Sequence, residues 1–357
     1  MMANISISKS IDHLNEEHIK QLIVPIVFFV ILLIIGVTGN FTVLLIYGRK
    51  YSKCVYRSII WNLAVADLTF CTIGIPFNIA RFVNHYTFTG NWICKMFTAL
   101  LLLGVHYSTN LLILLSLHRF RQVCMPLNEQ ITIKTVKYWL IGCFLFALLL
   151  SWPQAVVEEM EYPILENNQT GRICPITSSK PTVYWMVNSI ILLVLFVIYS
   201  FVLFFIYLLI GRKVYSERKR THTNDTSEIA EQGNNFSNKM TKIAFTISVA
   251  FAVSYLPVFL LKAAGPIDDA SLTPFTFSLL RLTERSYVVN HVANPFIYAI
   301  FDHRFRAQFK KIATHKWCLK RKQNGKESTT GSKKSSTFEP RQSSTNIIVH
   351  VTKILTH

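Results

Sequence analysis

Seven long apolar stretches recur along this chain, and each is about as long as a helix that crosses a lipid bilayer. They occupy residues 22–47, 58–81, 94–123, 136–156, 183–210, 242–264 and 273–301. Because 51% of the residues are hydrophobic and only 16% are charged, the composition argues against a soluble globular domain. We expect an all-α membrane protein whose residues 22–301 form a bundle of seven transmembrane helices. The seventh stretch is the least apolar, because Arg281, Glu284 and Arg285 interrupt its first turns.

The charges between the stretches predict how the chain is oriented. Lysine and arginine gather after the first, third and fifth stretches, whereas the alternate connections hold acids. Basic loops stay in the cytoplasm, so residues 1–21 are expected outside the cell and the C-terminus inside. The N-terminal segment lacks the pattern of a cleaved signal peptide, so the first helix is expected to target this multi-pass protein to the plasma membrane. Two glycosylation sequons, at Asn4 and Asn168, fall on the outer side.

The residues after the seventh stretch predict a short eighth helix over residues 302–318. Its aromatic residues recur at helical spacing opposite a basic face, a pattern typical of helices that lie in the membrane interface and attract anionic lipid. Cys318 is either a palmitoylation site or an unmodified thiol. Residues 319–357 are rich in lysine, serine and threonine and predict a disordered cytoplasmic tail. This tail either takes phosphate and binds basic partners or is merely solvated.

Asp67 is a lone carboxylate inside a predicted membrane helix. Such a group either protonates or binds a cation, and neighbouring amide and hydroxyl oxygens would be suitable ligands for sodium. The alternative is hydrogen bonding between helices without an ion. Pro76, Pro153, Pro257 and Pro295 each remove a backbone hydrogen bond and predict a kink.

Several motifs, in order along the stretches, resemble those of the rhodopsin-like family of G-protein-coupled receptors. They are Gly39-Asn40, Asn62-Leu63-Ala64-Val65-Ala66-Asp67-Leu68, Arg119, Phe251-Ala252-Val253-Ser254-Tyr255-Leu256-Pro257 and Asn294-Pro295-Phe296-Ile297-Tyr298. The resemblance implies a receptor that transmits the binding of an extracellular ligand to heterotrimeric G proteins. It also implies arrestin and receptor kinases as partners of the tail, and contact with membrane lipid.

The same resemblance assigns roles to individual residues. Cys94 and Cys174, which flank stretches on the outer side, would form a disulfide. An allosteric sodium pocket would consist of Asp67, Ser108, Asn290 and Asn294. The residues that couple to the G protein or rearrange on activation would be His118, Arg119, Tyr207, Phe251, Tyr255, Pro257, Pro295 and Tyr298.

Some positions depart from the family pattern. His118 stands where the family has an acid beside the arginine, so we expect raised basal activity. Tyr255 replaces the switch tryptophan, and Tyr199 replaces a fifth-helix proline. His291 replaces a small polar residue of the sodium pocket, where a protonated imidazole would compete with the cation.

The outer part of the bundle excludes some ligands. Leu101 stands where receptors for amines carry an aspartate, and Val288 stands where a photoreceptor carries its retinal lysine. Similarity to neuropeptide receptors and a charged pocket mouth favour a peptide with a carboxylate, which arginine binds bidentately. The expected pocket residues are Phe77, Arg81, Leu101, Val105, Lys262, Arg281 and Glu284. Alternatively, Arg281, Glu284 and Arg285 pair among themselves as a structural network.

Two other receptor functions stay open, namely a non-signalling scavenger or decoy of the same fold, for which His118 is the argument, and a receptor for a non-peptide small molecule. A transporter would show internal repeats and ionisable residues along a pathway, and the sequence has neither. It also lacks nucleophile, metal-ligand and phosphate-binding motifs, so we expect no enzyme activity and no cofactor besides sodium. The net charge of +18 lies in loops and tail, so no nucleic-acid partner is expected.

Overall fold

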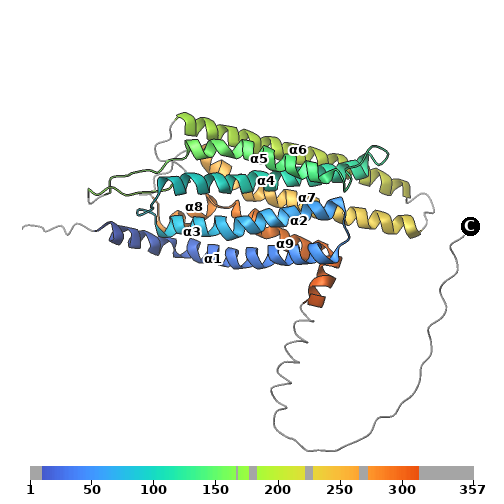
Figure 1. The fold of residues 1–357 in the computed structure, drawn as a ribbon, viewed down its shortest axis with the longest axis horizontal. Coiled ribbons are helices and arrows are strands. Elements are labelled where there is room, and N and C mark those ends of the chain that lie inside the picture. Colours follow the sequence, from blue (N-terminus) through green and yellow to red (C-terminus); the bar gives the residue numbers. More distant parts are fainter. Residues whose placement is uncertain (1–9, 166–167, 177–182, 222–227, 265–271, 313–357) are drawn as a thin grey trace, which may run out of the picture. The chain divides into compact units, whose positions relative to one another are not determined.

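The computed structural model describes residues 10–165, 168–176, 183–221, 228–264 and 272–312. The predictions for Asn4, Cys318 and the tail at 319–357 lie outside these residues. The described bundle is nearly all helical, and its helices lie side by side along one axis (Figure 1). They are α1 (Ile11–Lys50), α2 (Val55–Thr69), the π-helix η1 (Phe70–Gly74), α3 (Ile75–Val83), α4 (Asn91–Cys124), α5 (Val136–Val157), α6 (Val183–Thr221), α7 (Glu228–Ala264), α8 (Pro274–Thr283) and α9 (Val288–Phe301).

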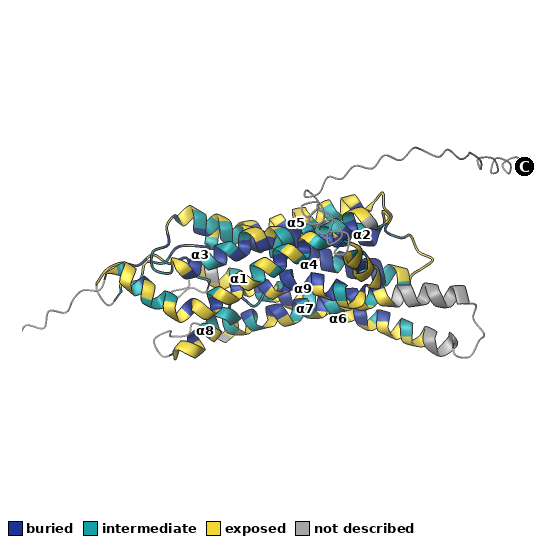
Figure 2. Cartoon of the chain, turned by 90° about the horizontal axis from the view of Figure 1, so that it is seen from below, coloured by how far each residue is buried: buried dark blue, intermediate teal, exposed yellow. Residues whose placement is uncertain are grey.

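The bundle has a partly polar interior and apolar outer faces. Figure 2 shows buried residues where helices meet and exposed residues on the faces that point outward. On α6, for example, Phe201 and Phe204 are each 66% exposed, whereas Asn40 and Asp67 are fully buried. Lipid is a good solvent for such outer faces, and water is not. Among the described residues, six helices are long and apolar enough to cross a membrane, and the shorter apolar helix Val288–Phe301 is a seventh candidate segment.

A π-helical turn interrupts the second crossing. The backbone N–H of Ile75 donates to the carbonyl oxygen of Phe70, five residues earlier, so this turn contains one residue more than an α-helical turn. Pro76 follows in the first turn of α3, where a proline needs no intrahelical N–H bond. Gly74, at the end of the π turn, lets α4 come close, because a Cβ there would lie 2.5 Å from the Leu101 Cδ2 atom.

The seventh crossing consists of two helices rather than one. After α8, the backbone N–H of Arg285 donates to the Leu282 oxygen at 3.1 Å, and that of Val288 donates to the Arg285 oxygen at 3.1 Å. These three-residue bonds form a tight turn before α9 begins. The break coincides with the charged residues that make this stretch the least apolar. The predicted all-α seven-helix bundle is therefore confirmed, with a divided seventh crossing.

Asp302 precedes a helix at residues 303–312, and residues 313–318 of the eighth helix predicted at 302–318 lie outside the described part of the chain. The Oδ1 atom of Asp302 accepts hydrogen bonds from the backbone N–H groups of Arg304 at 2.9 Å and Phe305 at 3.2 Å, as an N-cap residue does. Its Oδ2 atom accepts from the hydroxyls of Tyr47 at 2.9 Å and Tyr51 at 2.6 Å. Burial and the bond to Asp302 raise the pKa of Tyr51. One carboxylate therefore joins α1 to the start of this helix.

Candidate functional site

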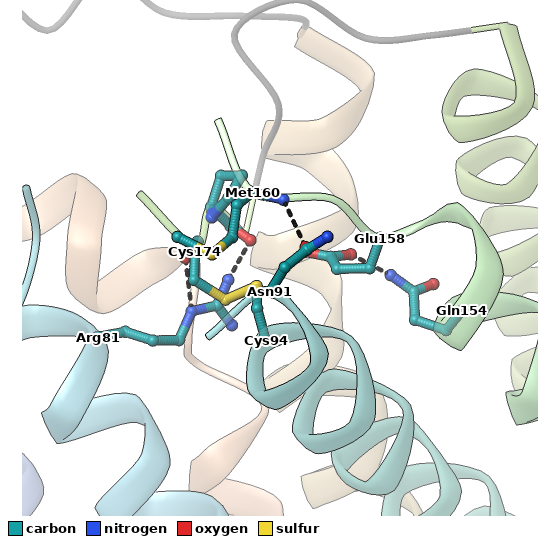
Figure 3. Close-up of a disulfide and its surroundings, with 8 residues drawn as sticks. Arg81, Asn91, Cys94, Gln154, Glu158, Met160 and Cys174 are labelled. Atoms are coloured by element: carbon teal, nitrogen blue, oxygen red, sulfur yellow. Dashed lines mark hydrogen bonds between the residues drawn. A yellow bond between two sulfur atoms is a disulfide. The ribbon is translucent and has the colours of Figure 1, made fainter. Parts of the chain in front are cut away.

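The loop between α5 and α6 covers the end of the bundle at which α4 begins, which we call the outer end, and the opposite end is called the inner end. A disulfide joins Cys94, in the first turn of α4, to Cys174 in this loop (Figure 3). Arg81 donates from Nε to the Cys174 carbonyl oxygen at 2.8 Å and from its terminal nitrogen to the Pro175 oxygen. The Asn91 side-chain oxygen accepts from the Met160 N–H at 3.4 Å. The predicted disulfide is thus present, and the Arg81 guanidinium, predicted to meet a ligand, is engaged with loop backbone.

A cavity of about 130 Å³ lies below this loop. Its walls come from α4, α6 and α7, with contributions from α5 and the turn before α9. Of the predicted pocket residues, Arg81, Leu101, Val105, Lys262 and Glu284 line it. Apolar liners include Leu102, Leu192, Phe196, Phe251, Val258 and Phe259, and further polar liners include Thr98, His106, Gln154, Glu158, Tyr199 and Tyr287. The cavity is therefore charged toward its outer end and mainly apolar in its walls.

Two predicted pocket residues lie outside this lining. Phe77 packs in the apolar core, where its ring centroid is 5.1 Å from that of Phe97. Arg281 donates to Glu284 Oε1 at 2.8 Å, while the other oxygen of Glu284 accepts from Arg285 at 3.0 Å. Arg281, Glu284 and Arg285 thus form the structural network that was the alternative prediction. Glu284 also lines the cavity.

Glu158, the residue directly after α5, is a buried acid at the cavity wall. Its side chain accepts a hydrogen bond from Gln154 Nε2 at 2.5 Å, and the Gln154 oxygen accepts from Asn188 at 2.7 Å. Burial raises the pKa of Glu158, and the positive charges of Arg81 and Lys262 partly oppose this rise. The sequence indicated an acidic outer loop, but it did not indicate that this one acid turns inward.

Asp67 lies at the centre of the bundle and is fully buried. Its Oδ1 atom is 2.8 Å from His291 Nδ1 and accepts from the Ser108 hydroxyl at 3.3 Å. Its Oδ2 atom accepts from Asn294 Nδ2 at 2.6 Å. The imidazole of His291 is stacked on the ring of Phe70 with a centroid distance of 3.8 Å. The structure thus brings Asp67, Ser108 and Asn294 together as the resemblance implied, and it adds His291 to them.

The predicted sodium pocket stays a prediction, because its residues combine oxygens suited to a hard cation with hydrogen bonds that need no ion. The side-chain oxygens of Asn290 and Asn294 are buried without hydrogen-bond partners, and such oxygens are ligands that hard cations prefer. However, each oxygen of Asp67 is already engaged, and one of its neighbours is a ring nitrogen, which is a ligand for softer metals. No cluster of three or more histidine, cysteine or acidic side chains suited to a metal occurs in the described part of the chain. The distances around Asp67 describe the other alternative, hydrogen bonding between helices.

Aromatic side chains connect the cavity with Asp67. Phe251 lies on α7 with its ring centroid 6.0 Å from that of Phe196 and 4.8 Å from that of Tyr255. The Tyr255 hydroxyl is 3.5 Å from His291 Nε2. Pro257 lies within α7 two residues beyond Tyr255, and Pro295 lies within α9 beside Asn294. A group that moves Phe251 or Tyr255 would therefore act on the residues around Asp67.

Arg119 lies at the inner end of α4 and makes no ion pair with any described residue. Its guanidinium carbon is 4.6 Å from the centre of the Tyr56 ring, a cation–π geometry, and its NH1 atom donates to Gln122 Oε1 at 2.8 Å. Its Nε atom, His118 Nδ1 and the Tyr298 hydroxyl are buried without hydrogen-bond partners. The hydroxyls of Tyr207 and Ser116 are 2.8 Å apart. Tyr56 and Gln122 thus restrain Arg119 in place of the missing acid.

Sequence reasoning missed several of these residues. Tyr56, Gln122 and Gln154 belong to none of the family motifs, and nothing in their local sequence indicates their contacts. His106 had one available signal: it continues the α4 face that carries Thr98, Leu102 and Val105 at helical spacing.

A helical bundle with a cavity near one end, a buried polar centre and a weakly held arginine at the other end has the architecture of a transmembrane receptor. The chain belongs to the rhodopsin family of 7 transmembrane receptors, whose pattern it matches over residues 39–298. It is a multi-pass membrane protein and a G-protein-coupled receptor, not an enzyme.

Several receptors of known name are similar to it. The chain is 28% identical to the C3a anaphylatoxin chemotactic receptor of Oncorhynchus mykiss, over 84% of this chain and 82% of that one. It is 25% identical to the allatostatin-A receptor of Bombyx mori, over 83% of this chain and 81% of that one. It is 28% identical to the neuropeptide Y receptor type 2 of Mus musculus, over 83% of this chain and 77% of that one.

Proposed function

We propose that this receptor binds an extracellular peptide at its outer end and passes the signal to a heterotrimeric G protein. The cavity carries the proposal: basic Arg81 and Lys262 and acidic Glu158 and Glu284 line it together. Both signs of charge suit a peptide, which has charged termini and side chains, better than a small apolar molecule. Similar receptors named for neuropeptide Y, allatostatin A and C3a support this reading.

We further propose that the chain resides in the plasma membrane with its N-terminus and the disulfide-bound loop outside. A disulfide between Cys94 and Cys174 forms under the oxidising conditions that the outer side provides. Asn168 lies exposed in the same loop, accessible for glycosylation. On the inner side, arrestin and receptor kinases are proposed partners of the tail, and anionic lipid is a proposed partner of the helix at 303–312.

Second-messenger output in cells tests the coupling. Cells expressing this chain are compared with cells expressing Arg119→Ala at matched surface level, without ligand and with neuropeptide Y, allatostatin A or C3a. Arg119 is the proposed contact with the G protein, so output above that of mock-transfected cells is expected to fall in the variant. A peptide that raises output only in the wild type would also support the ligand class.

The decoy function is the rival that one observation favours. His118 stands beside Arg119 where the family has an acid, and this departure is the observation that favours a decoy. Peptide binding and uptake at the cell surface, with no second-messenger output in either the wild type or Arg119→Ala, would establish the decoy and contradict coupling.

A further inference from the structure

His106 is a polar side chain in the cavity, and no protein group bonds to its Nε2 atom. It lies on α4, is only 5% exposed, and lines the cavity. Its Nε2 atom is buried and has no hydrogen-bond partner. Two other hydroxyls of the cavity lining point their hydrogens elsewhere, because Thr109 donates to the Val105 carbonyl oxygen at 2.8 Å and Tyr199 donates to Asn110 Oδ1 at 2.9 Å. A buried polar atom without a partner is uncommon, and a ligand that completes the bond gains affinity.

The position of His106 separates it from the charged residues of the cavity. Arg81, Glu158, Lys262 and Glu284 all lie at or near the ends of their helices. His106 lies twelve residues beyond Cys94 on α4, which corresponds to about 18 Å along the helix axis. The cavity therefore has charged residues at its mouth, and deeper along α4 it has an imidazole nitrogen without a hydrogen-bond partner.

The surroundings of His106 limit what can reach it. Leu102, Phe196 and Phe251 line the same cavity, and a charged group placed among them would lose its hydration without an ionic partner. A single water molecule would be held poorly, because a buried water needs two to four polar partners. The volume of about 130 Å³ is close to that of cavities that accommodate one benzene ring.

We propose that His106 forms a specificity subsite at the cavity floor, which takes an aromatic ring bearing one neutral hydroxyl, as in the phenol of a tyrosine side chain. The ring packs among the apolar liners while the hydroxyl bonds to Nε2, whichever of the two atoms donates. The subsite rests on the proposed function only in treating this cavity as the ligand site. Thr98, whose Oγ1 atom is also buried without a partner, lies eight residues and about 12 Å nearer the mouth, where it can bond to the next part of the same ligand.

Fragment binding to the purified full-length protein tests this subsite. The probes are 4-propylphenol and propylbenzene, which differ only in the hydroxyl, and the readout is the thermal unfolding midpoint as a function of probe concentration. We expect the wild type to bind 4-propylphenol roughly 3- to 10-fold more tightly, the value of one neutral hydrogen bond. His106→Leu should abolish this preference, and Thr109→Val should keep it, because the Thr109 hydroxyl already bonds to its own helix.

Two results would overturn the subsite: equal binding of the probes by the wild type, or a preference that persists in His106→Leu. His106→Phe provides a second variant if the leucine variant does not fold, and it too should lose the preference. The assay involves no signalling. A receptor that signals through Arg119 but shows no phenol preference would therefore contradict the subsite alone, whereas a phenol preference without signalling would contradict only coupling.

Discussion

The outer and inner ends of the bundle are held by different kinds of interaction. At the outer end, a disulfide ties the loop to α4, Arg81 bonds to that loop, and Glu284 pairs with two arginines. At the inner end, Arg119 is held by a cation–π contact with the ring of Tyr56 and by a hydrogen bond to the side chain of Gln122. Covalent and buried ionic links fix the geometry of a ligand site, whereas weaker contacts let two arrangements lie within a few kcal/mol of each other. The outer end, which holds the cavity, is thus more rigid, and the inner end around Arg119 is more easily rearranged.

The largest effect is expected from removing the covalent link. Cys94→Ser should lower the free energy of unfolding by about 4.5 kcal/mol, because the disulfide closes a loop of 80 residues and its stabilisation grows with loop length. The thermal unfolding midpoint and the surface level of the full-length protein measure this. Cys54→Ser is the control, since Cys54 is an exposed free thiol at the start of α2 and serine is a good N-cap residue. An equal loss of stability in both variants would show that the disulfide does not make the outer end more rigid than the inner end.

The buried ion pairs should come next. Glu284→Gln keeps the side-chain shape but leaves two buried guanidiniums without their acid, at a cost of about 3–5 kcal/mol in unfolding free energy. Glu159→Gln is the matched control at the surface. Glu159 is 3.6 Å from Lys95 and its side chain is 69% exposed, so its removal should cost less than about 1 kcal/mol. Chemical or thermal unfolding of the two variants measures the difference, and similar costs would contradict the rigid outer end.

A smaller effect, on signalling rather than stability, is expected at the inner end. Tyr56→Leu removes the ring that restrains Arg119 and should raise basal second-messenger output about fivefold, the equivalent of about 1 kcal/mol. Tyr56→Phe keeps the ring and should stay near the wild type. His118→Asp introduces the missing acid beside Arg119 and should lower basal output. If the leucine and phenylalanine variants have the same basal output at matched surface level, the ring does not restrain Arg119.

The smallest effect is a pH dependence at the outer end. Because burial raises the pKa of Glu158, the folded protein holds this proton more tightly than the unfolded chain. The resulting stability is present below about pH 4.3, the usual pKa of glutamate, and is lost as the pH rises through the raised pKa. Relative to Glu158→Gln, the wild type should therefore gain unfolding free energy as the pH falls from 7 to about 4.3.

His85 provides a second test, because its effect on stability should change with pH in the direction opposite to that of Glu158. Burial lowers the pKa of His85, so its contribution is lost as the pH falls below about 6.5, where the unfolded chain takes up the proton. His85→Gln should therefore be less acid-sensitive than the wild type. Unfolding midpoints measured across this pH range check both residues, and identical pH profiles for the wild type and both variants would contradict the buried titration.

The sequence predicted the bundle well because apolar length is a local property. It also flagged Arg281, Glu284 and Arg285 as an interruption, but hydropathy does not tell whether a charged segment bends or breaks a helix. Motif resemblance predicted that Asp67, Ser108 and Asn294 lie near one another, because these positions belong to fixed turns of three helices.

The sequence failed where side-chain direction depends on another segment. Arg81 lines the cavity as predicted for a pocket residue, but the sequence did not indicate that its guanidinium also bonds to a loop whose path no local pattern encodes. Glu158 turns inward because Gln154 and Asn188 form a chain of hydrogen bonds behind it. Tyr56 and Arg119 contact each other across two helices, although they lie more than sixty residues apart in sequence. Such contacts follow from packing across the bundle and not from spacing along the chain.

The π turn at Phe70–Gly74 determines how the residues after it are rotated about the helix axis relative to the residues before it. Each α-helical residue turns the chain by about 100°, so the extra residue sets the direction of everything that follows. Asp67 precedes the turn and faces the polar centre, whereas Arg81 follows it and reaches the disulfide-bound loop. Deleting one residue within this turn would restore a regular helix, leave Asp67 in place, and swing Arg81 away from the loop. One backbone irregularity thus lets the same membrane crossing direct Asp67 to the polar centre and Arg81 to the outer loop.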